Sequence, residues 1–203
     1  MMTNSTLTPR RDMRKRSLAL CAALGTMVIQ GCSQSAVTEP SDDVSFVRRI
    51  AEAHLSPTDG YETEGIVTFV QERDGIRIIA DVRNLSVNGR HGFHIHETGD
   101  CSAPDASSAG GHFNPSGEAH AGPMADKRHV GDLGNLESSE AGGAMYVRVD
   151  EHIRFEGENS IIGKAVVVHA KADDFKSQPS GAAGPRIACG VIQWSERPAD
   201  SED

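Results

Sequence analysis

The sequence predicts an all-β domain of eight short strands, arranged as a barrel or sandwich and carrying one long loop. Short apolar runs are separated by turn residues, and the chain holds 21 glycines while aromatic residues make up only 4%. The stretch 98–143 has almost no apolar periodicity. The expected strands are 50–55, 65–71, 76–85, 92–97, 145–149, 153–156, 165–169 and 187–192.

The first expected strand shows the clearest alternation. Ala51, Ala53 and Leu55 alternate with Glu52 and His54. A period of two is typical of a strand with one buried face. A helix through residues 47–55 is the competing interpretation.

The 98–143 stretch contains two glycine pairs and three histidines. A loop of this length without structure of its own is unusual in a compact domain, and such loops are typically functional or disordered. Something other than a hydrophobic core must therefore hold it.

The two ends of the chain predict a processed N-terminus and a polar tail. A basic stretch before residue 17 is followed by an apolar run too short to span a bilayer, which predicts a signal peptide over 1–31. Residues 32–45 then form a polar linker, 46–194 the domain and 195–203 an acidic tail. We expect an exported protein.

The apolar run ends in Ile29-Gln30-Gly31-Cys32, which resembles the bacterial lipobox. This resemblance implies that Cys32 carries a lipid, which is then the only membrane contact, and that the protein is periplasmic or on the cell surface. An ordinary signal peptide with an incidental cysteine is the alternative.

The charge of the chain argues against nucleic acid as a partner. The formal charge is −9, and removing residues 1–31 leaves 15 basic against 28 acidic residues, or −13. No basic patch remains for a phosphate backbone. Outside the signal peptide and Cys32, Cys101 and Cys189 remain as one possible pair in an oxidising compartment.

Several histidines have the pattern of metal ligands. His94 and His96 are two residues apart on an expected strand, so their side chains leave the same face about 7 Å apart. His169 ends another strand, and the long loop adds His112, His120, His129 and Asp132. Six histidines and an aspartate exceed the needs of one metal ion.

These residues lie in longer motifs with a family resemblance. Gly-Phe-His-Ile-His-Glu at 92–97, Gly-His-Phe-Asn-Pro at 111–115, Arg-His-Val-Gly-Asp-Leu-Gly-Asn at 128–135, Val-Val-His at 167–169 and the stretch 184–191 resemble the copper/zinc superoxide dismutases, in the same order. The match runs from about residue 65 to 192. The resemblance implies an eight-stranded antiparallel Greek-key barrel or sandwich, immunoglobulin-like in architecture.

The resemblance also implies the cofactors and the reaction. Copper would be held by His94, His96, His112 and His169, and zinc by His112, His120, His129 and Asp132. Two superoxide anions would become oxygen and hydrogen peroxide as copper cycles between oxidation states. His112 would bridge the metals and carry a proton, while zinc would be structural.

Further residues match family positions around the metals. Asp173 matches a carboxylate that hydrogen-bonds one copper and one zinc histidine, Arg186 matches the arginine that attracts superoxide, and Cys101 and Cys189 match an intrasubunit disulfide. The 173–186 segment is short and lacks the paired glutamates of animal members, which puts the strength of electrostatic steering in doubt.

Other interpretations remain beside the dismutase. A periplasmic copper or zinc store on the same fold would lack a ligand or the arginine, and this sequence lacks neither. An adhesion-type sandwich would not explain the ordered histidine motifs. Whether the domain acts as a monomer or a homodimer stays open.

Overall fold

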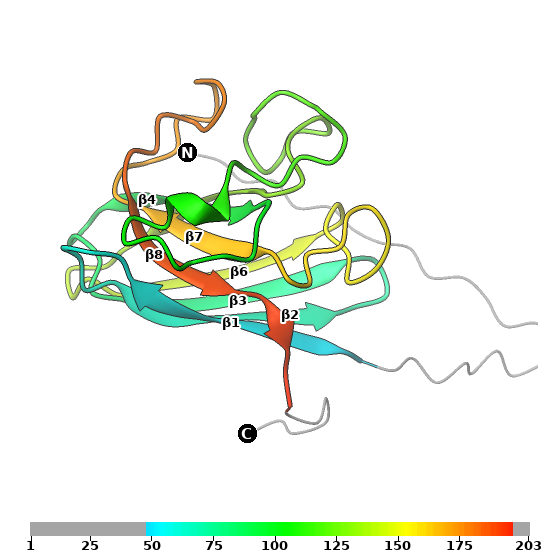
Figure 1. The fold of residues 1–203 in the computed structure, drawn as a ribbon, viewed down its shortest axis with the longest axis horizontal. Coiled ribbons are helices and arrows are strands. Elements are labelled where there is room, and N and C mark those ends of the chain that lie inside the picture. Colours follow the sequence, from blue (N-terminus) through cyan, green and yellow to red (C-terminus); the bar gives the residue numbers. More distant parts are fainter. Residues whose placement is uncertain (1–47, 197–203) are drawn as a thin grey trace, which may run out of the picture. The chain divides into compact units, whose positions relative to one another are not determined.

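The strands form one antiparallel sheet that curls into a nearly closed barrel (Figure 1). The computed structural model describes residues 48–196. The strands are β1 (Ile50–Pro57), β2 (Glu64–Gln71), β3 (Ile76–Arg83), β4 (Arg90–His96), β5 (Asp132–Glu137), β6 (Ala144–Asp150), β7 (Ala165–His169), β8 (Arg186–Val191) and β9 (Gln193–Trp194). A single-turn 3₁₀ helix, η1, spans Ser107–Ala109. The expected signal peptide, Cys32, the whole linker and most of the acidic tail lie outside the described residues.

Seven of the eight predicted strands are confirmed, including the one for which a helix competed. β1 pairs with β2 over six residues. Ala51 and Ala53 are fully buried while the His54 side chain is 72% exposed. The alternation therefore indicated a strand with one buried face, and His54 lies on the exposed face.

The predicted strand at 153–156 is wrong. This segment makes only an isolated bridge, between Arg154 and Ser160. Ile153 and Phe155 are buried because a loop packs them against the barrel core, although no neighbouring strand pairs with them. Alternation over four residues does not distinguish such a loop from a strand.

A strand that the sequence did not predict, β5, lies inside the stretch expected to be loop. Its pairing with β4 shifts register between Gly92 and His94, and Gly134 has a φ of +93°. Between these two pairs β5 has one residue more than β4, which is a β-bulge. The bulge breaks the period of two, so Leu133 and Leu136 are both buried although they are three positions apart. This bulge hides the strand from a search for alternation.

The order of the strands is β5-β4-β7-β8-β1-β2-β3-β6, and β9 adds to β1. β3 and β4 are consecutive in the chain but are not neighbours in this order, and the same is true of β6 and β7. Such crossings are the Greek-key connectivity that the family resemblance implied. They place β4 beside β7, so that histidines distant in sequence lie on adjacent strands.

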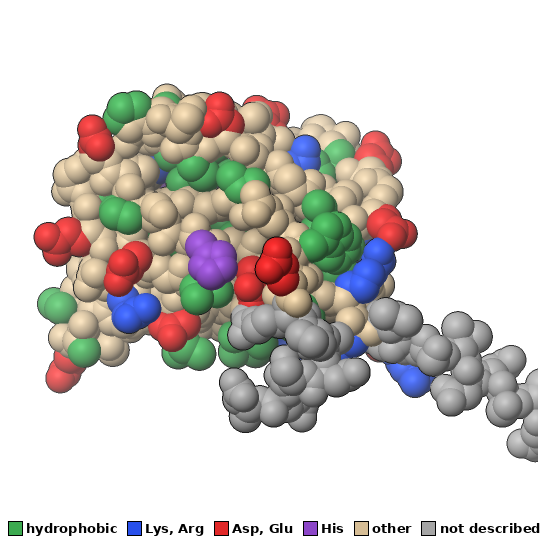
Figure 2. Space-filling view, turned by 60° about the horizontal axis from the view of Figure 1, so that its bottom comes forward, with side chains coloured by type: hydrophobic (Ala, Val, Ile, Leu, Met, Phe, Trp, Pro, Cys, Tyr) green, Lys and Arg blue, Asp and Glu red, His purple; other side chains and the backbone are tan. Residues whose placement is uncertain are grey.

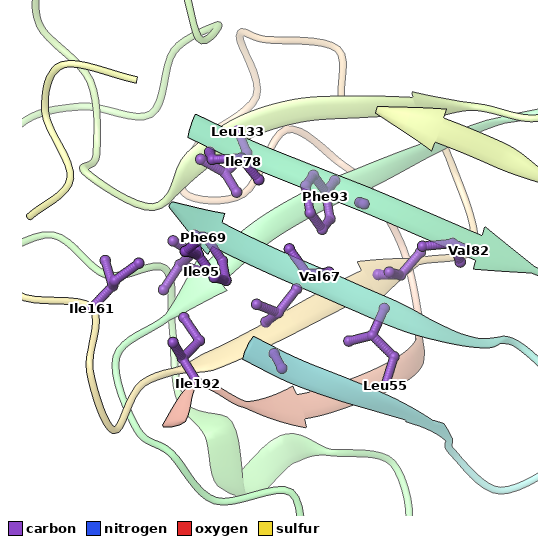
Figure 3. Close-up of a cluster of buried hydrophobic side chains, with 14 of the residues drawn as sticks. Leu55, Val67, Phe69, Ile78, Val82, Phe93, Ile95, Leu133, Ile161 and Ile192 are labelled. Atoms are coloured by element: carbon purple, nitrogen blue, oxygen red, sulfur yellow. The ribbon is translucent and has the colours of Figure 1, made fainter. Parts of the chain in front are cut away.

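The barrel interior is filled by apolar side chains from several of its strands (Figure 3). Val67, Phe69 and Ile78 come from β2 and β3, and Phe93 and Ile95 come from β4. All five are completely buried. Phe93 also meets the ring of Tyr146 edge-on, with centroids 5.3 Å apart. This core is the rigid support from which β4 presents its histidines.

The predicted disulfide between Cys101 and Cys189 is confirmed. It ties the start of the long loop to β8, beside a small apolar cluster formed by Ala106, Ala109, Ala165 and Val167. No helix within residues 48–196 is long and apolar enough to cross a membrane.

Candidate metal centre

The histidines on the strands meet a loop histidine in a first cluster. β4 supplies His94 and His96, the end of β7 supplies His169, and His112 approaches through an isolated bridge to His96. The possible ligand atoms of these four buried residues all lie within 4.8 Å of one another. Four neutral imidazoles are a donor set that suits copper.

A second cluster contains three histidines and one carboxylate. Its members are His112, His120, His129 and Asp132, again buried and within 4.8 Å of one another. Asp132 Oδ1 lies 2.8 Å from His112 Nδ1, 2.9 Å from His120 Nδ1 and 3.3 Å from His129 Nδ1. Three imidazole nitrogens and one carboxylate oxygen are a set of four donors that could hold a zinc ion.

His112 belongs to both clusters. Its Nδ1 faces Asp132, while its Nε2 is buried and has no hydrogen-bond partner among the described residues. His94 Nδ1 is buried without a partner in the same way, and the two rings have centroids 4.0 Å apart. Buried polar atoms normally have partners, so two orphaned nitrogens in one place indicate a ligand for them.

The opposite nitrogens of the first-cluster rings are engaged. His94 Nε2 lies 2.9 Å from Asp173 Oδ2, His96 Nδ1 lies 2.9 Å from the Gly110 carbonyl, and His169 Nδ1 lies 3.0 Å from the Gly184 carbonyl. Each contact fixes the orientation of its ring and leaves the other nitrogen for the cluster. His96 Nε2 and His169 Nε2 are accordingly only 3.4 Å apart.

Asp173 connects the two clusters from outside. Its Oδ2 meets His94 Nε2 and its Oδ1 meets His120 Nε2, each at 2.9 Å. Asn135 holds the Asp173 backbone in place, because its side-chain amide donates to the Asp173 carbonyl and accepts the Asp173 N–H. One buried carboxylate therefore orients a ring in each cluster.

Burial keeps the first-cluster histidines neutral. It lowers the pKa of His112 to about 4 and that of His169 to about 3, and lowers the pKa of His94 and His96 as well. Neutral imidazoles are the form that binds metal ions.

The second cluster favours positive charge. Burial opposes ionisation of Asp132, but hydrogen bonds from its three histidines outweigh burial and hold its pKa well below the ordinary range. Burial also opposes charge on His120, yet its hydrogen bonds to Asp132 and Asp173 raise its pKa to about 9. The two carboxylates that favour a proton on His120 would also favour a bound cation at this place.

The first cluster opens to solvent through a pocket of about 480 Å³. His96, His112 and His169 line it from inside, and Arg186 is its only lysine or arginine. The Arg186 guanidinium donates to the carbonyls of Ala106 and Gly110, at 2.5 and 2.6 Å. Lys176, the other cation of the 173–186 segment, does not line the pocket.

Sequence reasoning missed a buried ion pair beneath the second cluster. Arg128 and Asp150 have fully buried side chains 2.5 Å apart. Arg128 Nη1 also donates to the carbonyls of His129, Val130 and Asp132, so it supports the backbone of two cluster residues. His152 Nδ1 contacts Arg128 Nη2 at 3.1 Å. The only local signal was the arginine inside the 128–135 motif.

Comparisons with known proteins agree with this geometry. The family model described as copper/zinc superoxide dismutase (SODC) matches residues 63–192. A protein named superoxide dismutase [Cu-Zn] from Paramecium bursaria Chlorella virus 1 is 44% identical over 139 residues, covering 66% of this chain and 74% of that protein. Its namesake from Claviceps purpurea is 45% identical over 136 residues, covering 63% and 88%.

A solved structure has the same fold. The crystal structure of the clock protein EA4 superposes with a TM-score of 0.66 at 41% identity, covering 72% of this chain and 95% of that one. The family match covers more than half of the chain and includes every residue of both histidine clusters. The chain therefore belongs to the copper/zinc superoxide dismutase family, and it is an enzyme that disproportionates superoxide with copper and zinc as cofactors.

Proposed function

We propose that the first cluster holds the copper ion and the second the zinc ion of this dismutase. Copper then binds His94, His96, His112 and His169, and zinc binds His112, His120, His129 and Asp132. The observation that carries this assignment is the His112 ring, whose Nδ1 faces Asp132 while its buried Nε2 has no protein partner among the described residues. A ring with one nitrogen in each cluster can serve both ions.

The chemistry of the donors supports this division. The first cluster offers only imidazole nitrogens, and it opens to the pocket, as a reacting metal requires. The second adds a carboxylate, and only His112 and His129 of its four members line that pocket, against three of four in the first cluster. A closed set of nitrogen and oxygen donors is typical of structural zinc. When bound, copper supplies a one-electron redox change and zinc supplies a fixed positive charge.

The protein's own residues bind the substrate and handle the proton. Arg186 provides the positive charge in the pocket that attracts an anion toward the copper cluster. His112 Nε2 is the nitrogen at which the chain can hold a proton beside that pocket, because Nδ1 is engaged with Asp132. Asp173 orients the rings of His94 and His120, and it would hold both rings in position for the two metal ions.

The experiment compares metal content and activity in Asp132→Ala and the parent. This substitution deletes a proposed zinc ligand and leaves all four copper imidazoles, so zinc affinity should fall more than copper affinity. Metal analysis after dialysis against a chelator, beside a superoxide decay assay, measures both. Loss of copper with retention of zinc would show the assignment to be reversed.

We also propose that the protein is exported and anchored by a lipid on Cys32, in the periplasm or at the cell surface. The support is the basic and apolar leader and the lipobox-like residues before Cys32. The Cys101–Cys189 disulfide suits an oxidising compartment.

Cys32→Ser removes the sulfur to which the lipid would attach. The exported protein should then leave the membrane fraction or remain unprocessed, as fractionation and intact mass will report. Cys21→Ser, inside the leader, is the matched control and should change neither result. Membrane retention of Cys32→Ser after normal cleavage would contradict the anchor.

A further inference from the structure

The side-chain amide of Gln178 binds both backbone groups of His120. The His120 N–H donates to Gln178 Oε1 at 2.8 Å, and Gln178 Nε2 donates to the His120 carbonyl at 2.8 Å. The amide of Gln suits this paired contact because it carries a donor NH₂ and an acceptor oxygen on one planar group.

His120 is thereby held on all its polar atoms. Its Nδ1 meets Asp132 and its Nε2 meets Asp173, both at 2.9 Å, while Gln178 holds its backbone. Asp173 and Gln178 belong to the same short segment. That segment therefore binds His120 of the second cluster twice, at the ring through Asp173 and at the backbone through Gln178.

Tight packing shows that Gly181 of this segment lies against the contact between Asp173 and His120. Gly181 has a φ of +65°, and a Cβ there would lie 1.9 Å from Asp173 Oδ1 and 2.7 Å from His120 Nε2. Only glycine fits this position. The residues between Gln178 and Gly181, namely Pro179 and Ser180, line the copper pocket.

We propose that Gln178 is a positioning residue that latches the 173–181 segment over the zinc cluster and so slows the release of zinc. Release of zinc requires its bond to His120 to break, and this bond breaks more readily when the histidine can move away. Moving it requires breaking the paired bonds to Gln178 together with the bond to Asp173. This inference depends on the zinc assignment proposed above.

The test measures the rate at which fully metallated protein loses zinc to an excess of chelator. Gln178→Ala should release zinc about 10-fold faster, the lower end of the effect usual for residues that support metal ligands. Ser177→Ala is the matched control, since the Ser177 hydroxyl donates to Asp174 within the segment and forms no hydrogen bond with His120. It should release zinc at the parental rate.

A conservative variant and a spectroscopic signal sharpen the test. Gln178→Glu keeps an acceptor for the His120 N–H but cannot donate to the His120 carbonyl, so its release rate should lie between those of the parent and Gln178→Ala. Cobalt(II) in the zinc site should show altered visible bands in Gln178→Ala and parental bands in Ser177→Ala.

Three results would overturn the latch. The first is equal zinc release rates for Gln178→Ala and Ser177→Ala, and the second is parental cobalt bands in Gln178→Ala. The third is faster zinc release from Gln178→Ala together with a lower melting temperature of its metal-free form. The last would show general loosening in place of a local latch. Failure of the zinc assignment would look different, because Asp132→Ala would then keep its zinc.

Discussion

The strands and the long loops of this enzyme are held by different forces. In the barrel, apolar side chains such as Val67, Phe69 and Ile78 are completely buried against one another. Phe113 and Val130 of the long loop also pack into the core, but the loops that carry or cover His112, His120 and His129 add buried polar and covalent contacts. They include the Arg128–Asp150 pair, the Asp173 bridge and the Cys101–Cys189 disulfide.

The difference matters because the two kinds of contact fail differently. Apolar burial has no direction and scales with area, so its loss lowers stability without moving a ligand. Polar contacts are directional, and removing one partner leaves the other buried without a hydrogen bond. Damage to the barrel should therefore appear in the free energy of unfolding, whereas damage to the loops should also appear at the metal sites.

The largest effect should come from Cys189→Ser. The disulfide closes a separation of 88 residues, which restricts the unfolded chain by about 4 to 5 kcal/mol in the entropy model. Because the bond also holds the loop that contains His112, we expect lower metal retention together with lower stability. Thermal melts with and without reductant measure the first effect, and a melting temperature insensitive to reduction would contradict it.

Phe69→Ala tests the other half of the comparison. Removing a completely buried phenylalanine should cost about 3 to 5 kcal/mol in stability through the lost burial and the cavity left behind. Since Phe69 belongs to the apolar core and to neither metal cluster, the rates of copper and zinc release at a temperature well below the melt should stay parental. Rapid metal loss from this variant under those conditions would show that the two halves are not separable.

Arg186→Ile should have the smallest energetic effect but a visible kinetic one. The second-order rate should fall about 10-fold, equivalent to about 1.4 kcal/mol of lost attraction, while metal contents stay normal. Arg186 is the only lysine or arginine lining the pocket, where Glu97 adds a carboxylate. In the face shown in Figure 2, acidic side chains are spread over the surface, as expected of a negatively charged chain.

Salt sharpens the Arg186 prediction. In the parent, added salt should slow the reaction if Arg186 controls the approach, because screening weakens its local attraction. In Arg186→Ile the remaining repulsion should leave the rate unchanged by salt or slightly raised. A fully metallated variant with the parental rate at low ionic strength would remove this role from the arginine.

The sequence by itself determined most of the barrel and the identity of the clustered histidines. Alternation located β1 because a strand's side chains repeat every two residues, and the same rule placed His94 and His96 on one face. The family motifs then implied the disulfide, which the structure contains. Each of these inferences uses residues close together or motifs long enough to be specific.

Only the tertiary structure decided which polar residues support the site. The bulge beside Gly134 removed the alternation of β5, and the loop at 153–156 imitated a strand. Gln178 reaches His120 across 58 positions and Arg128 reaches Asp150 across 22. A single amide or guanidinium carries no local pattern, so its partner is known only once folding has brought the distant segments together.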